Sequence, residues 1–174
     1  QPQYIHTPLI YKFNEKGNKI KISKRKHPEA DMRFFDKEGY DKQAIIEYLM
    51  NLINSNFEIW RSKNKNADIM EFPFDGFNIT ANTPIFDFVK LNDVSKEIIS
   101  HYTAEECYAQ LLAWAREYSL ENVDYLVKDK DYVTKVLNID REKSKPRKDI
   151  YKWSMFFDLF DYMFSAPKKY EIEE

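Results

Sequence analysis

Apolar side chains recur every three or four residues along most of this chain, the spacing of helices that bury one face. The clearest stripe follows Thr103, whose hydroxyl is expected to form a capping box with Glu106 at the start of a helix over 104–118. Two short helices are expected within 121–138, and an aromatic-rich last helix over about 147–164. The pattern predicts a mainly α protein built as a helical array.

Earlier in the chain, Pro and Gly mark the expected starts and ends of helices. Pro28 stands where a helix would start and Gly39 where it would stop, and Asp41 then precedes a second helical stripe. Residues 54–82 read as a brief helical piece followed by an extended loop, and a further helix is expected to begin at Thr83-Pro84.

The N-terminal segment is different in pattern and in charge. Residues 4–13 alternate only roughly and are compatible with a short strand, while 14–28 read as a polar, lysine-rich loop. Residues 1–28 hold seven Lys or Arg and one Glu, a net charge of +6, whereas the remainder has 20 bases and 28 acids, a net −8. A short irregular or β-like N-terminal segment is therefore expected to carry a local anion site.

Composition excludes several classes of protein. A chain of 174 residues with 43% apolar side chains can form one compact domain or two small ones. The three Gly residues are isolated from one another, which excludes a Gly-rich nucleotide-binding loop. The single Cys excludes an internal disulfide and a Cys-based zinc site. Because no disulfide is possible within the chain, the cytosol is the expected compartment. No apolar run approaches the roughly 18 residues of a membrane span, so no membrane association is expected.

One segment suggests catalysis, Lys21-Ile22-Ser23-Lys24-Arg25. Cations are needed wherever negative charge develops on phosphate oxygens, and a Lys ammonium suits a triphosphate. Taken alone, such a short run is more often a solvated basic loop or a localisation-type basic run.

The other candidates are weaker. His6, His27 and His101 are far apart, so no metal site is expected. Cys107 lies on an apolar stripe and reads as a buried, inert thiol, and Glu105 and Glu106 read as helix-capping residues rather than an acid/base pair. A second basic cluster could meet an RNA backbone or form a solvated interhelix loop; its members are Arg141, Lys143, Lys145, Arg147, Lys148 and Lys152.

Three ordered landmarks resemble one known family. KISKR resembles the KMSKS loop of class I aminoacyl-tRNA synthetases, in the form common in the glutamyl and glutaminyl branch. FFDKEGYDKQAIIEYLMNLI (34–53) and TPIFDFVKLNDVSKEII (83–99) are similar to the segments that follow in glutamyl-tRNA synthetases. The helical stripes favour the bacterial type, because the archaeal and eukaryotic enzymes have β-barrel anticodon-binding domains. Asn82-Thr83 in place of Gly, and Asn92-Asp93 in place of an aromatic–Met pair, depart from the family pattern.

The resemblance implies a parent enzyme that uses ATP, with Mg²⁺, to join glutamate to tRNA(Glu) through glutamyl-adenylate. It implies that Lys24 binds the ATP phosphates and stabilises the transition state, that Lys21 assists, and that Ser23 holds the loop. It divides the chain into 1–28, the tail of the catalytic region; 29–100, a stem-contact-like region; and 101–174, the start of a helical anticodon-binding region.

The family's HIGH motif, Rossmann domain and glutamate pocket precede this loop. The chain is therefore expected to be a piece of a longer enzyme, to bind no ATP by itself and to be inactive alone. Exposed apolar residues around Phe160 and Phe164 are expected to favour weak self-association through 153–164, with 167–174 poorly ordered. The alternative function is a non-catalytic helical RNA-binding or scaffold domain with a basic arm.

Overall fold

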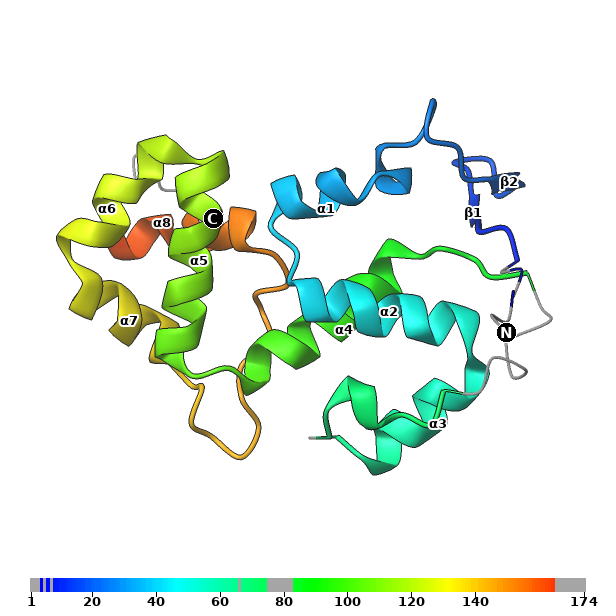
Figure 1. The fold of residues 1–174 in the computed structure, drawn as a ribbon. Coiled ribbons are helices and arrows are strands. Elements are labelled where there is room, and N and C mark those ends of the chain that lie inside the picture. The colour runs from blue at the N-terminus through cyan, green and yellow to red at the C-terminus, as the bar shows by residue number, and fades with distance from the viewer. Residues whose placement is uncertain (1–3, 5, 7, 66, 75–82, 165–174) are drawn as a thin grey trace, which may run out of the picture. The chain divides into compact units, whose positions relative to one another are not determined.

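The computed structural model describes residues 4, 6, 8–65, 67–74 and 83–164 and confirms the mainly α fold (Figure 1). The chain divides into two compact units, unit 1 with Gln1–Phe34 and Lys42–Val94, and unit 2 with Phe35–Asp41 and Ser95–Glu174. No helix among the described residues is both long enough and apolar enough to span a membrane. The elements of the described residues, with short 3-10 turns marked η, are β1 (Tyr11–Phe13), β2 (Lys19–Lys21), η1 (Pro28–Ala30), α1 (Met32–Glu38), α2 (Lys42–Ile53), α3 (Ser55–Lys63), η2 (Ile69–Glu71), α4 (Phe88–His101), α5 (Ala104–Tyr118), η4 (Leu120–Asn122), α6 (Val123–Lys128), α7 (Lys130–Asn138), η5 (Trp153–Met155) and α8 (Phe156–Phe164).

Unit 1 opens with a β-hairpin. β1 and β2 pair antiparallel, with Tyr11 opposite Lys21 and Phe13 opposite Lys19. The Asn14 side chain accepts hydrogen bonds from the Lys16 and Asn18 N–H groups at 3.0 and 2.9 Å, and so closes the turn. The lysine-rich segment expected to be entirely loop therefore contains a strand. Lys19-Ile20-Lys21-Ile22 does alternate polar and apolar residues, and that short period-two signal predicts a strand.

β1 also pairs with a distant part of unit 1. The Tyr11 N–H donates to the Pro84 carbonyl at 3.0 Å, and the Phe86 N–H donates to the Tyr11 carbonyl at 2.6 Å, forming a parallel bridge with Ile85. The expected helix start at Thr83-Pro84 is therefore wrong. Residues 84–86 are extended because their backbone groups pair with β1, and α4 begins only at Phe88.

The helix signals on α3 and α5 are confirmed. Asn54 caps α3, the brief helical piece predicted within 54–82; residues 75–82 of that segment lie outside the described residues. Thr103 and Glu106 form a capping box on α5, with the Glu106 carboxylate accepting from the Thr103 N–H at 2.7 Å. The cap reading of Glu106 is therefore correct.

Unit 2 buries one apolar cluster against the inner face of α5, with α6, α7 and α8 around that helix (Figure 1). The two short helices expected within 121–138 are α6 and α7. The buried members of the cluster are Ile99, Ala104, Cys107, Tyr108, Leu111, Ala115, Leu126, Val133, Val136, Leu137, Ile150, Trp153, Phe156 and Phe160.

The last predicted helix is shorter than expected. Residues 147–152 are not helical, because their polar groups bond elsewhere: the Tyr151 carbonyl accepts from Ser95 Oγ at 2.6 Å, and the Arg147 N–H donates to the Asp140 carbonyl at 3.2 Å. The helical part begins at Trp153 with a 3-10 turn and continues as α8.

The expected exposure of the aromatic stripe is wrong at Phe160, which is 2% exposed. Phe164 is half-buried, with its ring 5.6 Å from Tyr132 and 6.1 Å from Tyr125. Tyr125 of α6 and Tyr132 of α7 thus cover Phe164 within the chain itself. Self-association through 153–164 stays a prediction with a weaker basis, and residues 167–174 lie outside the described residues.

Gly39, which ends α1, provides the first test of this packing. Its φ is +81°, and a Cβ there would lie 3.0 Å from the Trp153 and Ser154 nitrogens and from Trp114 Nε1. The same close approach allows the Trp153 N–H to donate to the Gly39 carbonyl at 2.7 Å. Gly39→Ala should lower the free energy of unfolding by about 3 kcal/mol, through left-handed strain and overpacking together.

Gly17→Ala is the matched control, because Gly17 has φ +75° but nothing within 4 Å of the added Cβ. It should cost only the backbone strain, about 1 kcal/mol. Denaturant unfolding followed by circular dichroism measures both variants. Equal losses in the two would show that the contacts around Gly39 do not matter.

Cys107 supplies the second test. Its thiol is fully buried, and burial raises its pKa from 9.0 to about 11. Between these values the unfolded thiol ionises while the folded one keeps its proton, so the free energy of unfolding should fall as pH rises from about 9 to 11. At pH 8 a disulfide reagent should react with the folded chain at least about 100-fold more slowly than with the chain in denaturant. A comparable rate in both states would contradict the buried, inert assignment.

Candidate phosphate-binding site

The KISKR segment leaves the hairpin and enters a tight turn. Lys21 is the last residue of β2 and is exposed, and the Ile22 N–H donates to the Ile10 carbonyl at 3.1 Å. Lys24, Arg25 and Lys26 then form the turn, all three exposed. The pairing of β2 with β1 thus fixes where the basic turn begins.

Ser23 and His27 close this turn. The Ser23 N–H donates to His27 Nδ1 at 3.0 Å, and the Ser23 carbonyl accepts from the N–H groups of Lys26 and His27 at 3.0 and 2.9 Å. Because Nδ1 is the acceptor, the proton of the neutral ring lies on Nε2. Sequence reasoning considered His27 only as a metal ligand and missed this role; its position four residues after Ser23 was the available signal.

The chain is anchored again directly after the turn. Pro28 starts η1, and the buried Glu29 forms an ion pair with Lys12 of β1. Asp31 binds Arg33 in a fork, and the hydrogen bonds from the Arg33 side chain are the main cause that lowers the Asp31 pKa to about 2. Lys24 contributes a smaller electrostatic part to that pKa shift.

The cations of the turn are left without carboxylate partners. Within the described part of the chain, Lys21, Lys24, Arg25 and Lys26 form no ion pair. The Ser23 hydroxyl likewise forms no hydrogen bond with any described residue. A turn held by backbone bonds and presenting several unpaired cations can bind the oxygens of a phosphate chain without first breaking internal ion pairs.

A shallow depression of about 450 Å³ lies beside the hairpin. Lys16 and His27 line it, whereas Ser23 and Lys24 do not. The motif cations therefore lie outside this depression.

The second basic cluster is arranged differently. Lys143 pairs with Asp140 at 2.6 Å, Arg147 with Asp149 and Lys152 with Glu38 at 2.5 Å each, and Lys148 with Glu97, whose pKa it lowers chiefly through its hydrogen bond. These four side chains pair with acids of unit 2, which favours the interhelix loop over an RNA-binding surface.

Arg141, the remaining arginine of that cluster, is buried. Its guanidinium donates to the carbonyls of Leu137, Ile99 and Tyr102 at 2.9, 2.7 and 3.1 Å, which closes the C-terminal turns of α7 and α4. Among the described residues, no group of three or more His, Cys, Asp or Glu could hold a metal ion.

No family model matches the chain, but individual proteins do over nearly its whole length. It is 43% identical to a glutamate–tRNA ligase of Acetivibrio thermocellus over 163 residues, covering 94% of the chain and 30% of that protein. The glutamate–tRNA ligase of Clostridium perfringens strain 13 is 39% identical, covering 99% and 34%, and glutamate–tRNA ligase 1 of Petrotoga mobilis is 30% identical, covering 97% and 34%. The chain thus spans about a third of the length of the curated relatives it matches. Because the similarity covers nearly the whole chain, the chain belongs to the glutamate–tRNA ligase family.

Proposed function

We propose that this chain is the part of a glutamate–tRNA ligase that brings the cationic Lys21–Arg25 turn to ATP. The proposal is carried by one observation: the turn is fixed by backbone bonds at Ile22, Ser23 and His27, while its cations form no ion pair with a described residue. The names of the relatives supply the reaction.

In the proposed reaction, a carboxylate oxygen of glutamate attacks the α-phosphorus of ATP. The bond from that phosphorus to the bridging oxygen breaks, and glutamyl-adenylate and pyrophosphate form. A hydroxyl of the 3′-terminal adenosine of tRNA(Glu) then takes the glutamyl group and releases AMP. Lys24 is proposed to bind the phosphates and stabilise the charge that grows on the leaving pyrophosphate, with Lys21 assisting.

Ser23 is proposed to hold the turn rather than to react. Its N–H and carbonyl are both used within the turn, so its backbone cannot move without losing three hydrogen bonds. Its free hydroxyl can add a hydrogen bond to a phosphate oxygen.

Mg²⁺ is expected to accompany ATP in this reaction. The described residues offer no group of three His, Cys, Asp or Glu for it. Phosphate oxygens and water are the ligands that Mg²⁺ usually takes beside a nucleotide.

The proposal also includes the surroundings of the site. Residues 29–100 are proposed to contact the stem of the tRNA and 101–174 to begin the anticodon-binding region, in a cytoplasmic enzyme. The chain alone is expected to be inactive, because catalysis by positioning requires that both glutamate and ATP are held.

Lys24→Ala, made in the complete product of the gene, tests the proposal. Loss of a charge that acts on the developing pyrophosphate should lower the rate of glutamate-dependent ATP–pyrophosphate exchange by about 10²–10³, with little change in glutamate binding. Lys16→Ala is the control, since Lys16 is an exposed lysine on the turn of the same hairpin.

A loss of less than about threefold for Lys24→Ala would remove the catalytic role from the turn. If the complete gene product showed no exchange activity and Lys24→Ala weakened its binding of RNA, the alternative function, a non-catalytic RNA-binding domain with a basic arm, would replace the proposal.

A further inference from the structure

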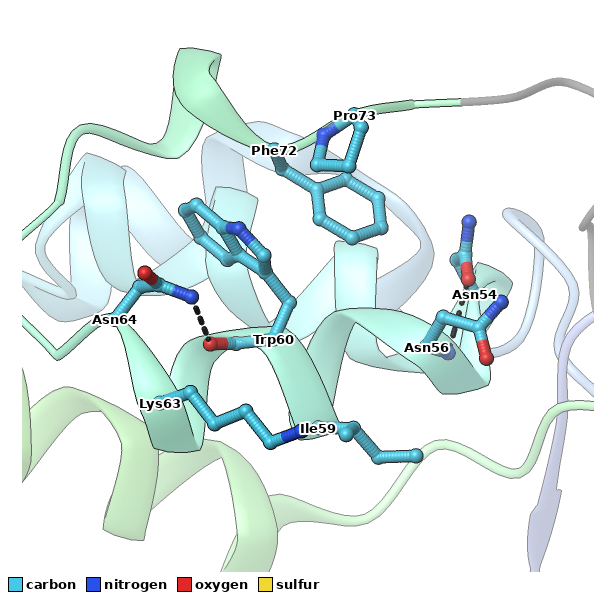
Figure 2. Close-up of a pocket in the computed structure, with 8 residues that line it drawn as sticks. All are labelled: Asn54, Asn56, Ile59, Trp60, Lys63, Asn64, Phe72 and Pro73. Atoms are coloured by element: carbon cyan, nitrogen blue, oxygen red, sulfur yellow. Dashed lines mark hydrogen bonds between the residues drawn. The ribbon is translucent and has the colours of Figure 1, made fainter.

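Unit 1 contains a second candidate site, a pocket of about 400 Å³ on the outer face of α3. Figure 2 shows the side chains of Trp60 and Phe72 next to each other on one side of it, with Asn54 and Asn56 at the start of the helix. None of the residues that line this pocket belongs to the Lys21–Arg25 turn. The pocket therefore needs an explanation of its own.

The aromatic wall of the pocket is held firmly. Phe72 packs edge-on against Trp60 at 5.4 Å and against the fully buried Phe57 at 5.1 Å. The Arg61 guanidinium lies 4.9 Å from the Trp60 ring, pairs with Glu47 at 2.7 Å and donates to the Ala67 carbonyl at 2.7 Å. Arg61 thus fastens the segment after α3 to α2 and covers part of Trp60.

The polar groups around this wall have spare hydrogen-bonding capacity. Asn54 is 1% exposed and uses its Oδ1 to cap α3 through the Asn56 N–H, but its Nδ2 donates to no described residue. The Trp60 indole N–H and the Asn56 side-chain amide likewise have no partner among the described residues. A buried amide with an unused donor at the edge of an aromatic pocket is a feature of a site built for a polar, planar ligand.

The charge of the residues that line the pocket further limits the class of ligand that it could bind. Lys63 is the cation of the lining, forms no ion pair with a described residue, and no carboxylate lines the pocket. A cationic ligand would find no counter-charge there, whereas a flat ring linked to one phosphate would meet every group present. Amide side chains both donate and accept, as the edges of nucleobases require.

We infer that this pocket binds one unpaired nucleobase of an RNA. The base stacks against Trp60, the amides of Asn54 and Asn56 bond its edge, and Lys63 meets the adjoining phosphate. The inference rests on the proposed function only in taking RNA as the partner, and it makes no use of the ATP turn.

The test uses the 174-residue chain labelled with ¹⁵N and a single-stranded octauridylate as the probe. The chain has three Trp, so three indole N–H signals are expected, and Trp60→Phe identifies the one from Trp60. Octauridylate should shift the Trp60 signal saturably and leave the Trp114 and Trp153 signals in place. An otherwise identical oligonucleotide without bases should bind about tenfold more weakly, because base–aromatic stacking is lost.

Lys63→Ala should weaken binding of octauridylate about three- to tenfold, and Lys65→Ala, which removes an exposed cation that does not line the pocket, should leave it unchanged. Both positions are exposed, so neither variant threatens the fold. An unmoved Trp60 signal, equal binding of the oligonucleotide without bases, or equal effects of the two Lys variants would each overturn the inference. Loss of exchange activity in Lys24→Ala bears only on the ATP turn, so the two proposals can fail separately.

Discussion

The pairing of Tyr11 with Pro84 and Phe86 is the constraint on which unit 1 depends. It joins the N-terminal hairpin to a segment about 70 residues later, and Tyr48 of α2 completes the junction because its hydroxyl accepts from the Asp87 N–H at 2.6 Å. The Tyr48 and Phe86 rings meet edge-on at 5.3 Å, and burial raises the Tyr48 pKa to about 12. β1, residues 84–87 and α2 are thus fixed together at one point. This junction sets the position of the hairpin that leads into the Lys21–Arg25 turn.

The electrostatic difference between the two basic clusters follows from where acids are available. Around the N-terminal turn, the nearest carboxylates are already used: Glu29 binds Lys12, and Asp31 binds Arg33. The turn cations are consequently left to solvent or to a ligand. In unit 2, acids stand beside the bases and pair with them, so a similar count of positive charges there stabilises the fold. Charge alone did not distinguish these cases; the distribution of acids in space does.

The sequence predicted those parts of the structure that depend on local chemistry. The capping box at Thr103, the stop at Gly39 and the short helices within 121–138 all follow from neighbours a few residues apart, and all are present. The failures occur where distant backbone groups compete with local preference. Residues 84–86 pair with β1 instead of starting a helix, and residues 147–152 bond to Ser95 and Asp140. The positions of Lys21 and Lys24 on the turn could be named from the motif, but the bond from Ser23 to His27 that shapes it required the fold.

Aromatic residues show why composition cannot separate core from site. The stripe of α8 is dense in Phe, and yet Phe156 and Phe160 are almost fully buried in the cluster to which α5 and α7 also contribute. Trp60 lies in a far more polar stretch and is only half-buried. Trp60 is distinguished by its neighbours in the fold. They are the Phe72 ring at 5.4 Å, the buried Asn54, whose Nδ2 donates to no described residue, and Lys63, which forms no ion pair with a described residue. The neighbours of a core aromatic are apolar or already hydrogen-bonded within the chain. The polar groups around Trp60 still have unused hydrogen-bond donors, and these unused donors are the physical basis for expecting a ligand there.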